Sequence, residues 1–215
     1  MSQMRLLLVL IVSVAVGMAG DLESARDRQD RIALAKLATG TPYQVALAQS
    51  YLSEVALELR DKREARVAAE AGIKAAQAAV HAEPNKAENH RLLGTLCGQV
   101  IPADPLGGMQ HGKCAKQEIE KALELDSKSA LAWVSSGVGK YYLPPFLGGG
   151  IELSLKDFEK AASLEPKLAE AWLWIGLAHR KAGRNGAART ALQKAMVLNP
   201  QRTWIKQQLE KTPTT

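Results

Sequence analysis

Cysteine is scarce in this chain of 215 residues: two are present, and neither belongs to a Cys-x2-Cys or His-x3-His pair. Structural zinc sites depend on such paired ligands, so a metal site built from Cys97, Cys114 and His111 is disfavoured. No serine stands in a nucleophile-elbow motif, and no group of histidines, acids or nucleophiles forms a catalytic set. We therefore expect no catalytic residue, no metal and no cofactor.

Strand patterns are also missing, because apolar and polar residues nowhere alternate in the way that a half-buried strand requires. With 47% hydrophobic and 23% charged residues, the composition is that of a globular protein and not of a disordered one. An all-α fold is the expectation that remains.

The apolar run near the N-terminus is too short to span a membrane comfortably. It covers residues 6–16, whereas a membrane helix needs about 20 residues. Arg5 precedes the run and the small residues Gly17-Met18-Ala19 follow it, an order typical of a secretory signal peptide. We expect residues 1–19 to be removed and residues 20–215 to form one exported domain, periplasmic or secreted, that meets the membrane only through its signal peptide. An uncleaved anchor is the alternative.

The stretch from Ala169 to Arg202 has the length and spacing of one helical hairpin of 34 residues. It resembles a tetratricopeptide repeat, whose pattern is W-x2-L-G-x2-Y, then A-x3-F, then a closing proline. The matching positions are Trp172, Ile175, Gly176, His179, Ala188, Leu192 and Pro200, with Ile, His and Leu in place of the family's Leu, Tyr and Phe. The small residues let two antiparallel helices approach closely, and neighbouring repeats must stack to bury their faces.

The same pattern recurs upstream in a looser form, and it is clearest in the closing turns at Pro84, Ser127, Pro166 and Pro200. We predict four helical hairpins, at about residues 42–84, 85–127, 128–166 and 167–200, in a tetratricopeptide-type α-solenoid. One helix from Asp21 to Ala38 should precede them. A capping helix over residues 201–211 should follow, with a polar outer side.

Local signals agree with these boundaries. Gly40-Thr41-Pro42 reads as a helix stop, an N-cap and a first-turn proline. Asp61 and Asn85 each precede a glutamate by three residues, so both are expected to cap the helix that follows.

Both cysteines fall in the second predicted hairpin, Cys97 near the end of its first helix and Cys114 near the start of its second. Antiparallel helices bring those two ends together, and in an oxidising compartment a disulfide follows. Two buried free thiols are the alternative.

A phosphate-binding loop is suggested by the pattern G-x4-G-K over residues 107–113. However, Cys114 stands where a Ser or Thr would hold magnesium, and two prolines precede the pattern where a buried strand should lie. We therefore do not predict nucleotide binding. Pro105-Leu106-Gly107-Gly108 is instead echoed by Pro145-Phe146-Leu147-Gly148-Gly149, so both stretches read as inter-helix loops that serve either as spacers or as a binding rim.

By resemblance to the repeat family, the first helices of the hairpins should line a concave groove that binds a protein or peptide, and not nucleic acid. Residues 160–215 hold ten Lys or Arg against three Glu, which indicates either an acidic partner or a solvated basic face. Arg180 and Lys181, beside Leu173 and Leu177, should form the basic end of the groove. The expected groove residues are Gln49, Arg91, Thr95, Val134, Val138, Tyr141, Leu173, Leu177, Arg180 and Lys181.

A second function stays open. Some exported tetratricopeptide proteins, such as the T component of TRAP-type transporters, enclose an apolar pore. Resemblance to that repeat class would make this chain a periplasmic carrier of an apolar small molecule or lipid, with Val134, Val138, Leu173 and Leu177 lining the pore. The sequence identifies neither the partner nor the oligomeric state.

Overall fold

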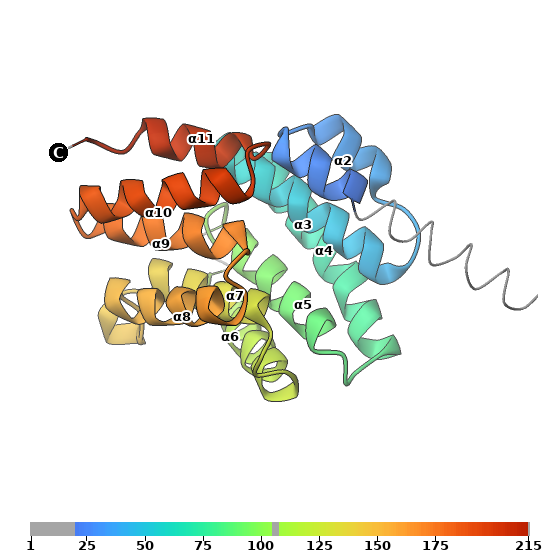
Figure 1. The fold of residues 1–215 in the computed structure, drawn as a ribbon. Helices are drawn as coiled ribbons and strands as arrows, with labels where there is room; N and C mark the ends of the chain where they lie inside the picture. The colour runs from blue at the N-terminus through green and yellow to red at the C-terminus, as the bar shows by residue number, and fades with distance from the viewer. Residues whose placement is uncertain (1–19, 105–107, 215) are drawn as a thin grey trace, which may run out of the picture.

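The computed structural model describes residues 20–104 and 108–214. The predicted signal peptide, residues 1–19, and most of the first predicted inter-helix loop, residues 105–107, lie outside these ranges. Within them all regular structure is helical, and consecutive helices pack as antiparallel pairs (Figure 1). The pairs are α3 (Pro42–Glu58) with α4 (Lys62–Ala82), α5 (Ala87–Val100) with α6 (Gly108–Leu125), α7 (Ala130–Tyr142) with α8 (Ile151–Leu164), and α9 (Ala169–Lys181) with α10 (Asn185–Leu198). None of the helices in the described ranges is long and apolar enough to cross a membrane.

The first helices of the pairs form one inner layer, because α3 contacts α5, α5 contacts α7 and α7 contacts α9. The closing turns lie at the expected positions, immediately after Glu83, Asp126, Glu165 and Asn199. The fold is therefore the all-α repeat architecture that the sequence predicts.

A repeated hydrogen bond shows the periodicity directly. Trp133 Nε1 donates to the carbonyl of Ser127 at 2.9 Å, and Trp172 Nε1 donates to the carbonyl of Pro166 at 3.0 Å. In each case the acceptor is the closing turn of the preceding hairpin, six residues earlier. His90 occupies the same position in the second hairpin, and its Nε2 lies 2.8 Å from the carbonyl of Pro84. Because a carbonyl oxygen only accepts, this nitrogen carries the hydrogen.

The prediction of one helix from Asp21 to Ala38 is wrong. Residues 20–27 are helical, the backbone reverses at Gln29 (φ 57°), and α2 (Arg31–Leu37) begins after Asp30, whose side chain accepts from Ala33 N. The reversal lets Leu22 and Leu34, on separate helices, bury in one cluster against α3. The free energy gained by burying these apolar side chains exceeds the cost of the helical hydrogen bonds lost at the break.

Of the two predicted capping residues, one is confirmed. Asp61 accepts a hydrogen bond from Glu64 N at 3.1 Å and caps α4. Asn85 does not cap α5, because that helix begins one residue later than expected and its N-cap position is Lys86, which makes no side-chain bond there. The Gly40-Thr41-Pro42 boundary is confirmed: Gly40 has φ +97°, and Thr41 and Gln44 form a capping box.

Close helix approach depends on the glycines of the repeat pattern. A Cβ placed on Gly176 would lie 2.6 Å from Cγ of Leu192, and one placed on Gly137 would lie 2.4 Å from the ring of Phe158. These distances are well inside van der Waals contact, so both positions require glycine. The repeat register read from the sequence matches the helix contacts at these two positions.

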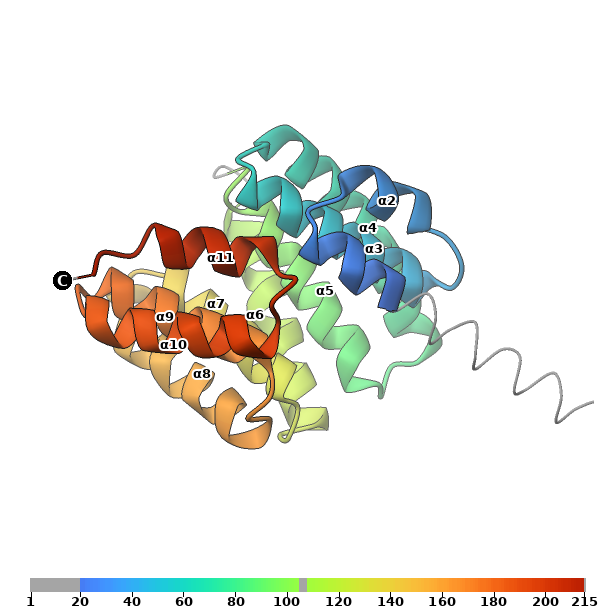
Figure 2. The same ribbon diagram turned by 45° about the horizontal axis from the view of Figure 1, so that its top comes forward.

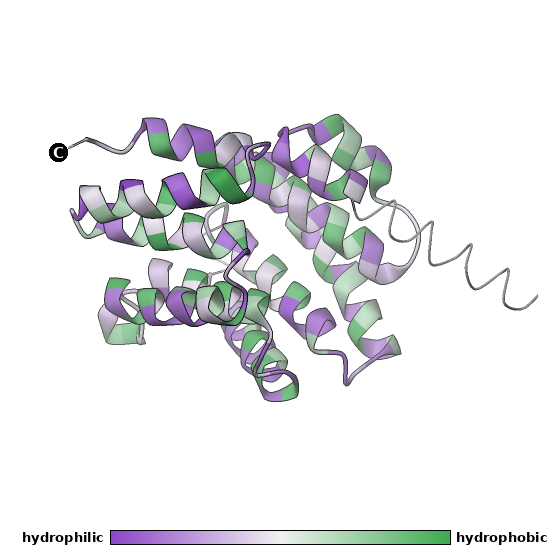
Figure 3. Ribbon diagram, viewed as in Figure 1, coloured by the Kyte–Doolittle hydropathy of each residue, from purple (hydrophilic) through white to green (hydrophobic). Residues whose placement is uncertain are grey.

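The chain curves until the turn after the last hairpin meets the N-terminal helices. Figures 1 and 2 show the N-terminal helices beside the turn between α10 and α11 (Thr203–Glu210). Hydrophobic and hydrophilic residues mix along the helices (Figure 3), and the buried hydrophobic ones form clusters where helices pack together. α11 covers the last hairpin, with Ile205 fully buried against Leu173, Leu177 and Leu192.

Replacing Gly176 with Ala should lower the free energy of unfolding by about 1–3 kcal/mol, because the new methyl group overpacks the α9–α10 contact. Gly186→Ala is the matched control in the same hairpin, because a Cβ there meets nothing within 4 Å. The control should be neutral or stabilising by up to about 1 kcal/mol. Chemical denaturation measures both, and equal stabilities of the two variants would contradict the packing assignment.

Candidate functional site

The inner layer carries a row of polar side chains that link successive hairpins. Tyr43 on α3 donates to Glu88 on α5 at 3.2 Å, and Arg91 forms a bidentate pair with the same carboxylate. Arg91 also donates to Thr95, which lies 3.0 Å from Ser135 on α7. The row thus crosses three hairpins, and its side chains form hydrogen bonds with one another.

Burial and charge act in opposite directions on this row. Burial by itself lowers the pKa of Arg91, but the carboxylate of Glu88 more than offsets it, so the pKa is raised and the guanidinium stays charged. Burial raises the pKa of Tyr51 on the same layer to about 12, and that tyrosine stays neutral. Arg26 stacks over the Tyr51 ring, 4.8 Å from its centroid. On α3 and α5, the polar side chains of the inner layer are therefore already paired with one another.

Several predicted groove residues are buried and are not accessible to a partner. Leu173 is 0% exposed, Leu177 4% and Val134 5%, and all three pack in the apolar cores between helices. Arg91 is 8% exposed and is held by Glu88. Of the four residues proposed to line an apolar pore, Val134, Leu173 and Leu177 are buried in these cores and Val138 is half-buried.

The remaining predicted groove residues are partly accessible. Thr95, Val138 and Tyr141 are half-buried on the inner layer, while Gln49 lies with its Cβ against Gly72 of α4, within its own hairpin. The predicted groove residues therefore differ in accessibility, and they do not all share one open surface.

An aromatic cluster surrounds Trp174 on α9. Trp174 lies next to Tyr141, Tyr142 and Trp204, with ring centroids 5.6, 6.3 and 5.9 Å away. It also stacks on Phe158 at 5.8 Å. Trp174 and Trp204 are half-buried, and Tyr142 is 63% exposed. We call Tyr141, Tyr142, Trp174 and Trp204 the aromatic cluster.

The sequence contains a signal for this cluster that the repeat pattern does not explain. Trp174 occupies no packing position of the repeat pattern, because those positions in its helix are Trp172, Ile175, Gly176 and His179. A large aromatic residue outside the packing positions has to face another surface.

The two basic residues predicted at the end of the groove have different roles. Arg180 donates to the side chain of Gln208 at 2.7 Å and to the backbone of the same residue at 3.1 Å, so it secures α11. Lys181 is exposed; it donates to the carbonyl of Tyr141 at 2.7 Å and lies 4.1 Å from that ring's centroid. Of the pair, Lys181 presents its charge beside the aromatic cluster.

The ends of the chain are joined by a buried ionic cluster around Arg202, whose side chain is 0% exposed. Arg202 pairs with Glu54 at 2.8 Å, with Glu58, and with Asp27 at 3.6 Å. Asn199 donates to Asp27 at 2.7 Å. We call Asp27, Glu54, Glu58, Asn199 and Arg202 the terminal clasp. It connects residues at least 144 positions apart in the sequence.

Burial within the clasp changes the ionisation of Glu58. Burial raises the pKa of Glu58 to about 7, and the pairing with Arg202 only partly opposes that shift. Glu170, at the start of α9, faces the same region, and burial followed by the charge of Glu54 raises its pKa too. The clasp therefore changes its protonation near neutral pH.

The clasp predicts a specific pH dependence of stability. The pKa of Glu58 is higher in the folded chain than in the unfolded chain, so its contribution is fully present below about pH 4.5 and is lost as pH rises through about 7. In Glu58→Gln this dependence is removed. The free energy of unfolding of the variant minus that of the wild type should rise between about pH 5 and pH 8, by up to about 3 kcal/mol.

Urea denaturation across this pH range gives the difference directly. Glu210→Gln is the control, because Glu210 is exposed on α11 outside the clasp. A Glu58→Gln difference that stays constant with pH, or that falls, would contradict the assignment.

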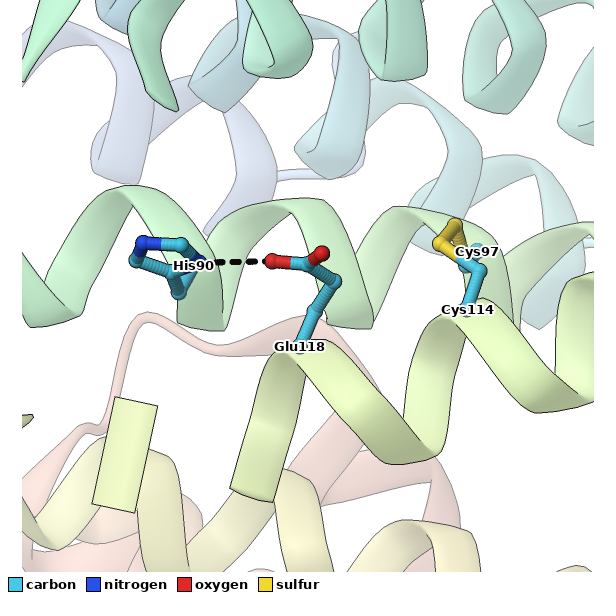
Figure 4. Close-up of a disulfide and its surroundings, with 4 residues drawn as sticks. All are labelled: His90, Cys97, Cys114 and Glu118. Atoms are coloured by element: carbon cyan, nitrogen blue, oxygen red, sulfur yellow. Dashed lines mark hydrogen bonds and ion pairs between the residues drawn. A yellow bond between two sulfur atoms is a disulfide. The ribbon is translucent and has the colours of Figure 1, made fainter. Parts of the chain in front are cut away.

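The second hairpin has two side-chain links between its helices (Figure 4). Cys97 on α5 and Cys114 on α6 form a disulfide, with Cα atoms 6.0 Å apart. Further along the same pair of helices, Nδ1 of His90 lies 2.6 Å from Glu118. Since both thiols are used in the disulfide, they are not available to a metal. Among the described residues no group of His, Cys, Asp or Glu has metal-binding geometry.

The G-x4-G-K pattern has no phosphate-binding geometry in its described part. α6 begins at Gly108, so Gly112 and Lys113 are helical and the backbone amides do not form an open loop.

If Cys97 and Cys114 are bonded in the purified protein, neither should react with a thiol reagent in denaturant without a reductant, and both should react after reduction. Reduction should also lower the free energy of unfolding by about 3 kcal/mol, the chain-entropy expectation for a loop of this length. Mass spectrometry of the labelled chain counts the thiols. Labelling of both cysteines without reductant would rule the bond out.

Comparison with known proteins gives two family matches. A model of the tetratricopeptide repeat matches residues 169–202, the same hairpin that the sequence pattern identified. A model described as regulator of microtubule dynamics protein 1-3 matches residues 15–143, which is more than half of the chain. No curated protein matches the sequence.

Two solved structures of repeat proteins align with this chain, and TTC0263 shares its fold. TTC0263, a thermophilic TPR protein in Thermus thermophilus, aligns with a TM-score of 0.59 and 17% identity over 94% of this chain and 95% of its own. YrrB, described as a TPR protein with an unusual peptide-binding site, aligns with a TM-score of 0.45 and 18% identity over 77% of this chain and 74% of its own. At these identities the likeness concerns architecture alone.

Proposed function

This chain belongs to the family described as regulator of microtubule dynamics protein 1-3, and from that premise we propose that it is an exported helical-repeat scaffold that binds a protein or peptide through the aromatic cluster and Lys181. Helical-repeat domains generally bind proteins or peptides and are typically not catalytic. The family description names a regulatory role, and a scaffold regulates by holding a partner.

The observation that carries this proposal is the position of Lys181 against half-exposed aromatic rings. Tyrosine and tryptophan, together with arginine, are the residue types that dominate binding energy at protein interfaces. Tyr141 and Tyr142 lie on one hairpin, Trp174 on the next and Trp204 on the covering helix, so one ligand would contact several elements at once. A fixed positive charge beside these rings favours a ligand with an acidic residue next to an apolar anchor.

Export is supported by two features of the chain. Residues 1–19 have the order of charged, apolar and small residues of a signal peptide. The Cys97–Cys114 disulfide is typical of oxidising compartments. The carrier function has less support, because three of the four residues that would line an apolar pore, Val134, Leu173 and Leu177, lie in the core.

Selection of a displayed random-peptide library against the purified protein, followed by affinity measurement of the selected peptides, tests the proposal. The selected peptides should place Asp or Glu within a few residues of an apolar side chain. Lys181→Ala should weaken their binding about fivefold, corresponding to about 1 kcal/mol, and added salt should weaken binding to the wild type but not to the variant.

Lys194→Ala is the matched control. Lys194 also stacks on a tryptophan, 3.4 Å from the Trp172 centroid, but on α10 and outside the aromatic cluster. Its substitution should leave binding unchanged. Equal effects of the two substitutions, or peptides without acidic residues, would argue against this site.

A further inference from the structure

The junction between the two ends of the chain is polar. Besides the contacts of the terminal clasp, Arg202 donates to the carbonyl of Arg26 at 3.3 Å, and Gln207 on α11 donates to Gln29 at 3.3 Å. In the described part of the chain, the apolar cluster of the N-terminal helices and that of the last hairpin have no residue in common. Separating the two ends would therefore break polar contacts and leave both apolar clusters intact.

The charged groups at this junction balance one another only when two protons are bound. Four carboxyl groups and two guanidinium groups lie together there: Asp27, Glu54, Glu58, Glu170, Arg26 and Arg202. Burial raises the pKa of Glu58 to about 7, and burial followed by the charge of Glu54 raises that of Glu170. With both of these acids protonated, Asp27 and Glu54 match the two guanidinium groups. Full ionisation would leave two unmatched negative charges in surroundings that solvate charge poorly.

The clasp is continuous with the aromatic cluster along two routes. The guanidinium carbon of Arg202 lies 5.8 Å from the ring centroid of Trp204, and that centroid lies 5.9 Å from the centroid of Trp174. Glu170 precedes Trp174 by four residues on α9, so the two side chains share a face of that helix. A change in the charge of the clasp therefore acts on two members of the aromatic cluster.

The two ends of α11 are held by different contacts. Its start follows Arg202, which is the N-cap residue of the helix. At its far end, Arg189 donates to the carbonyls of Leu209 and Thr212 at 3.3 and 2.7 Å. Loss of the clasp would thus act on the start of α11, where Trp204 lies, and leave the far end attached.

We propose that the terminal clasp is a latch that holds the aromatic cluster together and releases it as pH rises, an inference that rests on the binding function proposed for that cluster. Below about pH 6 the charges balance and the latch is closed, with Trp204 against Trp174. As pH rises through the pKa of Glu58, about 7, the closed form loses stability and the two ends separate. Trp204 then moves away from Trp174. A partner binds the closed form and is released from the open one.

Fluorine NMR of the chain labelled with 5-fluorotryptophan reports on the latch without any ligand. The chain has four tryptophans, and single Trp→Phe substitutions assign their resonances. Between about pH 6 and pH 8.5 the resonances of Trp174 and Trp204 should shift together, with a midpoint near the pKa of Glu58. Trp133, which binds a closing turn on α7, is the internal reference and should not shift.

A double variant removes the titration. Glu58→Gln combined with Glu170→Gln keeps both side chains neutral at every pH, so its resonances should stay where the wild type has them at low pH. Glu120→Gln is the matched control, because Glu120 is an acid on α6 with a side chain 59% exposed, and it should respond as the wild type does. Wild-type resonances that do not shift, an equal shift of Trp133, or the same shift in the double variant would each overturn the proposal. The wild-type titration decides even if the double variant does not fold.

Spin labels on the two sides of the junction measure its separation. Arg28→Cys and Gln201→Cys place one label on each side, at exposed positions outside the clasp. The native cysteines are joined in a disulfide and do not take up label. Pulsed electron resonance should show one short distance at about pH 6 and a growing population at longer distance toward about pH 8.5. An unchanged distance distribution would contradict the latch.

Peptides selected against the protein at about pH 6 test the link to binding. Their affinity for the wild type should fall about fivefold or more by pH 8.5, a usual size for coupling between sites, and their affinity for the double variant should stay constant. Resonance and distance changes in a protein that selects no peptide would support the latch and contradict the proposed function. Binding that depends on Lys181 but has the same affinity across this pH range would contradict the latch and support the proposed function.

Discussion

The burial of Arg202 constrains the whole chain. A guanidinium removed from water must be matched by carboxylates, and the available ones belong to Asp27, Glu54 and Glu58 at the other end of the sequence. The repeats must therefore curve until first and last hairpins meet. This closure also places α11, whose Ile205 covers Leu173 and Leu177. An ion pair of this kind contributes more to the choice of one arrangement than to net stability, because desolvation offsets much of the attraction.

Closure divides the inner face into two regions of different character. Near the N-terminal hairpins the polar groups pair among themselves, as Tyr43, Glu88 and Arg91 do. Toward the C-terminal hairpins Tyr142, Trp174 and Trp204 retain exposed ring surface. A partner gains little by replacing hydrogen bonds that already exist, whereas it gains directly by covering aromatic surface. The second region is thus the better binding surface.

Sequence reasoning succeeded where the structural cause is local. Hairpin spacing follows from residues within one repeat: Gly176 meets Leu192, and the ring at position 90, 133 or 172 reaches the turn six residues before it. Asp61 caps its helix because its acceptor and donor are three residues apart. The helix break at Gln29 was not predicted, because its cause is packing against α3, which is not local. The cap at Asn85 was predicted wrongly because α5 begins one residue later, a difference that local patterns do not resolve.

The predicted groove residues show the same difference between local and non-local causes. Leu173 and Trp174 are neighbours on one helix, and each has the residue type of a groove floor. Leu173 is buried because α11 folds over it, and nothing within its own repeat encodes that contact. Likewise, Arg180 donates to Gln208 on α11, and Arg202 pairs with carboxylates that lie 144 or more positions away in the sequence.

By itself, therefore, the sequence determined the helical hairpins, their register and the small residues at their contacts, because these depend on spacings within about 34 residues. Only the tertiary structure decided which face of each inner helix stays open and which acids surround Arg202. Those outcomes depend on the sum of small rotations between successive repeats, and that sum is a property of the assembled stack and not of any one segment.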